Sequence, residues 1–170
     1  FVVNHTFDRL AEPFFIRSAT PIPTGDYRYL DYSAFFSTDS SAMISGFGGI
    51  DWGEFWNGRL RSLNGGISLK PNVHLAVDID YDQNLVKLPN VQFTTELVGA
   101  RISYAFNPRT FLTGLFQYNA ETRQVSSNIR FNLIHSSLSD LFLVYNDLRD
   151  AGGRVVERAV TVKLTNLFNF

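Results

Sequence analysis

The segment Ala159–Phe170, with the sequence AVTVKLTNLFNF, decides the fold class. Its even positions are mostly apolar, while its odd positions include Thr161, Lys163 and Thr165. Successive side chains of a β-strand point to opposite faces, so this pattern predicts a strand with one lipid-compatible face and one polar face. The residues expected on the lipid face are Val160, Val162, Leu164, Phe168 and Phe170.

The same alternation recurs upstream of this segment, and no stretch shows a helical period. In 73–81 the odd positions are aliphatic or aromatic, whereas His74, Asp78 and Asp80 occupy even positions. Arg101 and Arg130 likewise alternate with apolar neighbours. Aromatic side chains lie near the ends of the apolar faces, where an interfacial girdle would lie.

Composition narrows the class further. Aromatic residues make up 15% of the chain, Phe alone accounts for 16 residues, and there is one Met and no Cys. This balance favours strands over helices. The absence of Cys excludes a disulfide scaffold and a thiolate metal site. The net charge of −1 gives no basic surface for nucleic acid. No apolar run approaches the roughly 18 residues of a membrane helix.

The turn signals divide residues 1–170 into ten strands of one domain, each joined to the next as a hairpin. Tight turns are predicted at 70–72, 107–109 and 135–139, and longer connections at 11–25, 83–92 and 147–155. Asn57-Gly58 is a strong two-residue hairpin signal. Short turns at one end and long loops at the other are typical of outer-membrane barrels. We therefore expect an all-β, antiparallel up-and-down transmembrane barrel of about ten strands in the bacterial outer membrane, with both termini periplasmic.

A soluble sandwich or lipocalin-like barrel would also alternate, with its apolar face inside. Two features favour the inverted arrangement. The polar face carries small or charged residues, as a wet lumen would, and the apolar face is aliphatic in the middle and aromatic at the rim.

Several stretches, in order along the chain, resemble a known family. The most specific combination is FLVYN at 142–146, then RD at 149–150, then VKLTNLF at 162–168. The chain resembles the C-terminal barrel region of bacterial outer-membrane proteins whose N-terminal half is similar to a family-nine carbohydrate-binding module. Further matches are EPFFI at 12–16, IPTGDYRY at 22–29, LPNVQFTTELVGARISY at 88–104, FLTGLFQYN at 111–119 and SSNIRFNLIH at 126–135.

The resemblance implies a barrel whose aromatic C-terminus is read by the outer-membrane insertion machinery. Val160, Val162, Leu164, Phe168 and Phe170 would form that signal. Family members are longer, with a periplasmic module and more strands, so these ten strands would then belong to a wider barrel. The module is absent from this sequence, so carbohydrate binding is not carried over, and the family supplies no catalytic residues.

The charged residues of the polar faces are the candidate lumen lining. His74, Asp78 and Asp80 share a face, but neighbours along a strand are about 6.6–7 Å apart, too far for one ion to bind all three easily. We therefore favour a polar lining and no metal site. The charges would either pair and fill a narrow barrel or set the ion preference of a wider one. The candidates are Asp31, His74, Asp78, Asp80, Arg101, Arg130 and Lys163.

Two further groups of residues lie at the predicted outer end. The first group is aromatic and charged, and it would either bind a sugar or a partner protein or simply form a girdle and a solvated loop. Its members are Asp51, Trp52, Glu54, Trp56 and Arg59. Acidic residues at the same end offer only a distant outer-membrane hydrolase hypothesis, because no GxSxG, HExxH or phosphate loop is present. They are Asp8, Glu12, Asp147 and Asp150, with Arg149 beside them.

We expect no enzyme and no cofactor. The leading hypothesis is a passive channel or transport-associated barrel; the alternative is a structural or assembly subunit, or an anchor, in an envelope or extracellular assembly. The expected partners are outer-membrane lipid, the insertion machinery, and a second copy or another envelope protein.

Overall fold

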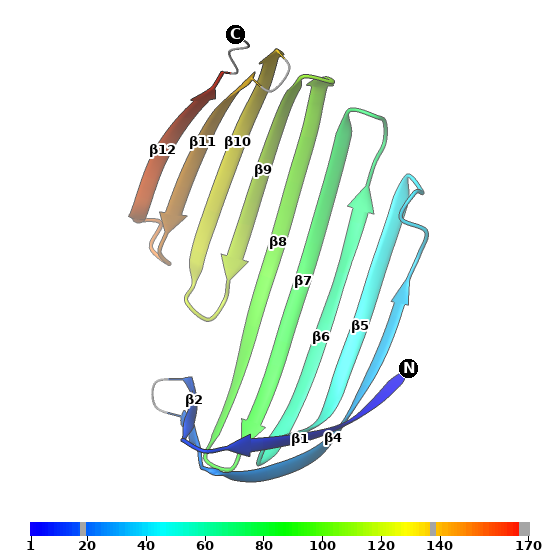
Figure 1. Ribbon diagram of the computed structural model, residues 1–170, viewed down its shortest axis with the longest axis vertical. Coiled ribbons are helices and arrows are strands. Elements are labelled where there is room, and N and C mark those ends of the chain that lie inside the picture. Colours follow the sequence, from blue (N-terminus) through cyan, green and yellow to red (C-terminus); the bar gives the residue numbers. More distant parts are fainter. Residues whose placement is uncertain (18–19, 137–138, 167–170) are drawn as a thin grey trace.

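The computed structural model describes residues 1–17, 20–136 and 139–166 and shows a large antiparallel sheet (Figure 1). Ten strands follow one another as a meander in the order β1-β4-β5-β6-β7-β8-β9-β10-β11-β12, and β2 pairs with β3 in a separate small hairpin. The strands of the meander are β1 (Val2–Leu10), β4 (Gly25–Ser37), β5 (Ile44–Phe55), β6 (Gly58–Leu69), β7 (Leu75–Leu88), β8 (Val91–Asn107), β9 (Thr110–Asn119), β10 (Gln124–Ser136), β11 (Ser139–Arg149) and β12 (Val155–Thr165). The hairpin consists of β2 (Phe14–Arg17) and β3 (Thr20–Ile22). The predicted ten-stranded antiparallel meander is thus confirmed.

Cross-strand register converts the alternation of each strand into two continuous faces. Residues directly opposite each other in a ladder lie on the same side of the sheet. One row, which defines the apolar face, contains Val160, Tyr145, Ile129, Gly114, Ile102, Val77, Leu69 and Ile44. The adjacent row, which defines the polar face, contains Ala159, Asn146, Asn128, Leu115, Arg101, Asp78, Ser68 and Ser45.

The sheet has almost no hydrophobic core of its own. Among the described residues the buried hydrophobic side chains are Ile22 and Val86. The apolar face is open instead: Ile67 is 61% exposed, Ile79 52% and Val162 64%. A sheet normally buries an apolar face against a second layer. Here the described part of the chain supplies no second layer for that face.

The sheet does not close into a barrel, so the closed ring expected from the sequence is not formed. β1 and β12 each have one partner in the described sheet, β4 and β11, and their outer edges are free. The register explains the separation. The row through Val2 passes through Ser33, Asp51, Ser62, Asn84 and Thr95, which lies beyond the paired end of β9. β1 and β12 are therefore displaced along the strand direction, as in a strongly tilted wall. Phe168 and Phe170 lie outside the described residues.

The predicted sorting of short and long connections was wrong. The segment 83–92 is mostly strand, because β7 runs to Leu88 and β8 begins at Val91. Polar residues there pair across strands: the Ser62 hydroxyl donates to Asn84 Oδ1 at 2.7 Å. At the end predicted to have only tight turns, β4 and β5 are separated by 38–43. The segment between β1 and β4 remains the longest connection, and it contains the β2–β3 hairpin.

The β5–β6 turn uses Trp56 and Asn57, one residue earlier than the Asn57-Gly58 signal suggested. Trp56 adopts the left-handed conformation, with φ of 47°. Gly58 then opens β6, directly opposite Phe55. The described residues include no helix long and apolar enough to cross a membrane.

Gly58 is required by close packing. A Cβ at this position would overlap the carbonyl oxygen of Lys87 and meet Leu88 Cα at 3.0 Å. We expect Gly58→Ala to lower the free energy of unfolding by about 1–3 kcal/mol. A denaturant titration would measure the loss. The matched control is Gly65→Ala, whose added Cβ has its nearest neighbour at 3.4 Å. Equal stability of the two variants would contradict this account.

Candidate functional site: the polar face and its hairpin end

The predicted lumen residues are gathered on one face but not into one cluster. The six that lie in strands all belong to the polar face. They are Asp31 in β4, Asp78 and Asp80 in β7, Arg101 in β8, Arg130 in β10 and Lys163 in β12. His74 precedes β7, and its Nδ1 lies 2.7 Å from the carbonyl oxygen of Ala105. Their spread over the sheet suits a lining rather than a single site.

Ion pairing does not hold these charges together. Asp78 and Arg101 are directly opposite in register. Nevertheless, the ion pairs found in the described ranges involve other residues. In the same ranges, no three His, Asp or Glu side chains are arranged to hold a metal ion. The polar face therefore presents separated charges to whatever occupies the space beside it.

Short polar side chains form hydrogen bonds between neighbouring strands across the polar face, and the sequence interpretation missed these contacts. The Ser33 hydroxyl donates to Asp51 Oδ1 at 2.6 Å, and Asn84 Nδ2 donates to Thr95 Oγ1 at 3.3 Å. Asn4 Nδ2 similarly donates to Asp31 Oδ2 at 2.9 Å. Alternation alone places these residues on one face, but only the register reveals which of them meet. Hydroxyl, amide and carboxylate groups in rows make a surface that water wets readily.

The β2–β3 hairpin lies against the polar face at the end of the sheet that carries the β5–β6, β7–β8 and β9–β10 turns. We call this end the hairpin end; Figure 1 shows β2 beside β8 and below the β9–β10 turn. The Arg17 guanidinium stacks on Phe93, 3.7 Å from the ring centroid, and pairs with Glu121 at 2.6 Å. Ile22 is 1% exposed. The hairpin is therefore docked on the sheet rather than projecting from it.

A second set of contacts fixes the base of the hairpin. The rings of Phe14 and Trp56 lie 5.0 Å apart. Trp56 Nε1 and the Tyr29 hydroxyl both donate to Asp8 Oδ2, at 3.2 and 3.0 Å. Asp8, one of the acidic residues weighed for hydrolysis, thus anchors the turn and β4 to β1. Together the two sets of contacts hold the hairpin between the β5–β6 turn and the β9–β10 turn.

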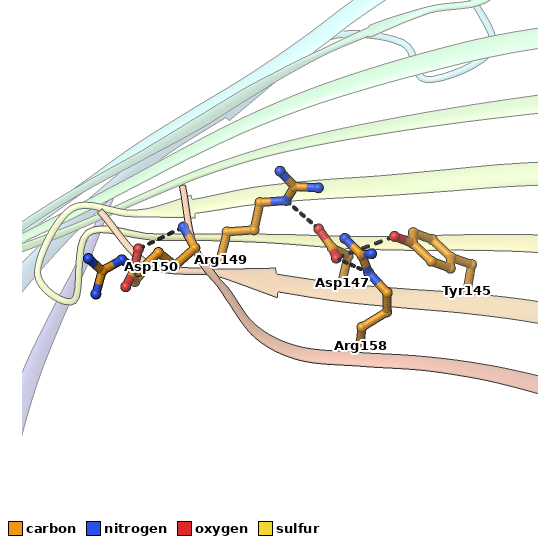
Figure 2. Close-up of polar contacts among 6 residues, drawn as sticks. Tyr145, Asp147, Arg149, Asp150 and Arg158 are labelled. Carbon is orange, nitrogen blue, oxygen red and sulfur yellow. Dashed lines mark hydrogen bonds and ion pairs between the residues drawn. The ribbon is translucent and has the colours of Figure 1, made fainter. Parts of the chain in front are cut away.

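Asp147 forms a separate cluster on the apolar face (Figure 2). It lies opposite Arg158 and beyond Tyr145 and Val160, where the apolar stretch of these strands ends. Its two carboxylate oxygens accept from Arg149 Nε at 2.6 Å and Arg158 Nε at 2.8 Å. Hydrogen bonds from Arg149 and Arg158 lower the pKa of the Asp147 carboxyl below its ordinary value.

The acidic residues of this end do not form a pair. Asp150 Oδ1 accepts from the backbone N–H groups of Gly152 and Arg154, at 2.9 and 3.0 Å, and so caps the β11–β12 turn. Asp147 joins β11 to the edge strand β12. Both carboxylates are engaged in structural contacts, whereas paired acid–base catalysis needs two carboxyl groups facing one reacting bond.

The predicted aromatic and charged tip is divided between the two faces. Asp51 and Trp56 contact polar-face residues, as described above. Trp52, Glu54 and Arg59 instead border a groove of about 470 Å³ on the apolar side, together with Arg61 and Lys87. A one-residue step along a strand changes the face, which separates residues that are adjacent in sequence.

A scan of protein-family models, a search of curated proteins and a search of solved structures each find no match to this chain. The family resemblance therefore stays a prediction. The features that bear on function are the two faces of the sheet and the docked hairpin.

The contacts of Arg17 predict how firmly the hairpin is held. We expect Arg17→Ala to remove the stacking on Phe93 and the ion pair with Glu121, raising the population of undocked hairpin about tenfold. Limited chymotrypsin digestion measures this through the cleavage rate at Phe14 and Phe15. The control is Arg109→Ala in the β8–β9 turn at the opposite end. Unchanged cleavage in Arg17→Ala would show that these contacts do not hold the hairpin.

Proposed function

We propose that this chain forms the wall of a bacterial outer-membrane β-barrel whose polar face lines a passage. One observation carries the proposal: a ten-stranded sheet exposes a continuous apolar face and has almost no core. Burial of apolar surface is the main driving force for folding in water, so a wide uncovered apolar face needs another environment. Lipid supplies it, and the resemblance to outer-membrane proteins supports the same assignment.

The position of the β2–β3 hairpin supports the assignment of the polar face to the interior. In a soluble barrel the apolar face would line the inside and the polar face would meet water. Here the chain folds its longest connection over the polar face. A connection that enters the interior narrows the passage beside it, and the separated charges of Asp78, Asp80 and Arg101 would then act on solutes.

Closure of the wall is part of the proposal. Strands of the meander alternate in direction, so β1 and β12 run antiparallel to each other. An open edge in a membrane leaves backbone groups unsatisfied, so the edges must pair with each other or with further strands. We propose that Val160, Val162, Leu164, Phe168 and Phe170 guide insertion of β12 through the insertion machinery.

Opposite faces of β8 provide the sharpest test of the membrane proposal. We expect Ile102→Arg to impair folding into phosphatidylcholine vesicles by about 2–4 kcal/mol, because this side chain would face lipid. Ser103→Arg, on the next residue, should fold like the wild type. Gel mobility before and after boiling measures the folded fraction. The reverse result would indicate a soluble barrel with its apolar face inside.

The channel hypothesis is tested separately by planar-bilayer recording. We expect the wild type to conduct ions, and replacement of 13–22 by a short Gly-Ser linker to raise the single-channel conductance because the hairpin no longer narrows the passage. The Arg109→Ala variant is the control. Protein that inserts fully and conducts with neither sequence would contradict a channel.

The free edges also favour one alternative, a structural or assembly role. An unpaired edge strand is a template for a strand from another chain. Insertion without conductance, together with a defined multimer in light scattering, would support an anchor or assembly subunit. A monomer that conducts would exclude it.

A further inference from the structure

The groove on the apolar side of β4–β7 carries an excess of positive charge. Its lining includes three cationic side chains, Arg59, Arg61 and Lys87, and one carboxylate, Glu54. Glu54 lies opposite Arg59 in register, but its Oε2 accepts the backbone N–H of Leu30 at 3.1 Å. Within the described part of the chain, none of the three cations forms an ion pair.

Two of these cations are aligned by the sheet itself. Arg59 and Lys87 are directly opposite on β6 and β7, and Arg61 is two residues from Arg59 on the same face. Opposite-charge pairs are the stabilising choice for such neighbours, whereas like charges repel. A cluster of cations without acidic partners is therefore unfavourable alone and is relieved by an anion. Phosphate suits it, because guanidinium groups bind phosphate oxygens through paired N–H donors.

The surroundings of the cations suit the headgroup level of a membrane. On β6 the apolar side chains Leu63 and Ile67 lie on the same face as Arg61 but farther from the hairpin end, and both are exposed. Trp52 and Tyr32 stack at 5.7 Å beside the groove, and Phe1 lies 6.2 Å from Trp52. Tyr and Trp rings are enriched at this level, and long cationic side chains extend from it toward water.

We propose that this groove binds the phosphate of an anionic membrane lipid, with Arg59, Arg61 and Lys87 contacting the headgroup and Leu63 and Ile67 contacting its chains. The inference rests on the proposed membrane location, and it names the class of lipid that binds at the hairpin end of the sheet. The Glu54 carboxylate accepts the backbone N–H of Leu30 in β4, and the three cations exceed its single negative charge.

The test uses the full chain, folded in detergent micelles, and native mass spectrometry with phosphatidylglycerol and phosphatidylcholine as probes. We expect the wild type to bind phosphatidylglycerol at least about tenfold more tightly than phosphatidylcholine. Arg59→Gln combined with Arg61→Gln should abolish this preference. Arg101→Gln combined with Arg130→Gln removes the same charge from the polar face and should leave the preference unchanged.

Additional variants and a second probe test the same site in other ways. If the double variant does not fold, Lys87→Gln should weaken and Lys87→Arg should retain the preference. Equal loss in the polar-face control would overturn the site, because the preference would then follow net charge. Inorganic phosphate that saturates the protein and displaces phosphatidylglycerol would overturn the lipid assignment.

Folding of the wild type into phosphatidylcholine vesicles, measured by gel mobility, separates this inference from the proposed function. Insertion without any lipid preference overturns only the groove assignment. Failure to insert overturns the membrane proposal, and the lipid assignment with it.

Discussion

The alternation of side chains across a pleated sheet is the constraint on which this molecule depends. Because antiparallel register keeps opposite residues on the same side, ten separate alternations add up to two continuous faces. One face is apolar along the row through Val160, Ile102 and Val77, and the other carries most of the charged, hydroxyl and amide groups of the middle of the sheet. A one-residue shift of a strand would exchange all its apolar and polar side chains between the faces, so the register fixes both faces at once.

A sheet with one apolar and one polar face needs a different environment on each side. The usual solution is a second layer over the apolar face, and the described residues include none. Contact between the sheet and lipid solves the same problem with a single layer, provided that backbone groups at the edges are paired. In the proposed membrane barrel, the free edges of β1 and β12 and the open apolar face would be two consequences of one architecture.

The sequence predicted what depends on local periodicity and missed what depends on long-range geometry. The ten strands, their antiparallel order and the shared face of Asp31, Asp78, Arg101 and Lys163 follow from alternation and turn chemistry. The length of β7 and β8 did not follow, because Gln83 and Asn84 were interpreted as loop residues. In the sheet they pair with Glu96 and Thr95 through hydrogen bonds of 2.7 and 3.3 Å. Because the partner strand satisfies these polar side chains, they do not end β7.

The docked hairpin shows the same limit at the candidate site. Arg17, Phe93 and Glu121 are far apart in sequence, and none of them alternates in a way that marks a contact. Their meeting requires the sheet to bring the β9–β10 turn toward the segment between β1 and β4. The sequence identified this segment as a long connection with prolines, which describes an exposed loop equally well.

The segment folds onto the polar face instead of extending into solvent, and this position gives it a different structural role. The docked hairpin covers part of the polar face at the end of the sheet where the groove of Arg59, Arg61 and Lys87 lies on the other face. The two faces at that end would thus meet different chemistry, solute on one side and lipid phosphate on the other, separated by the thickness of one sheet.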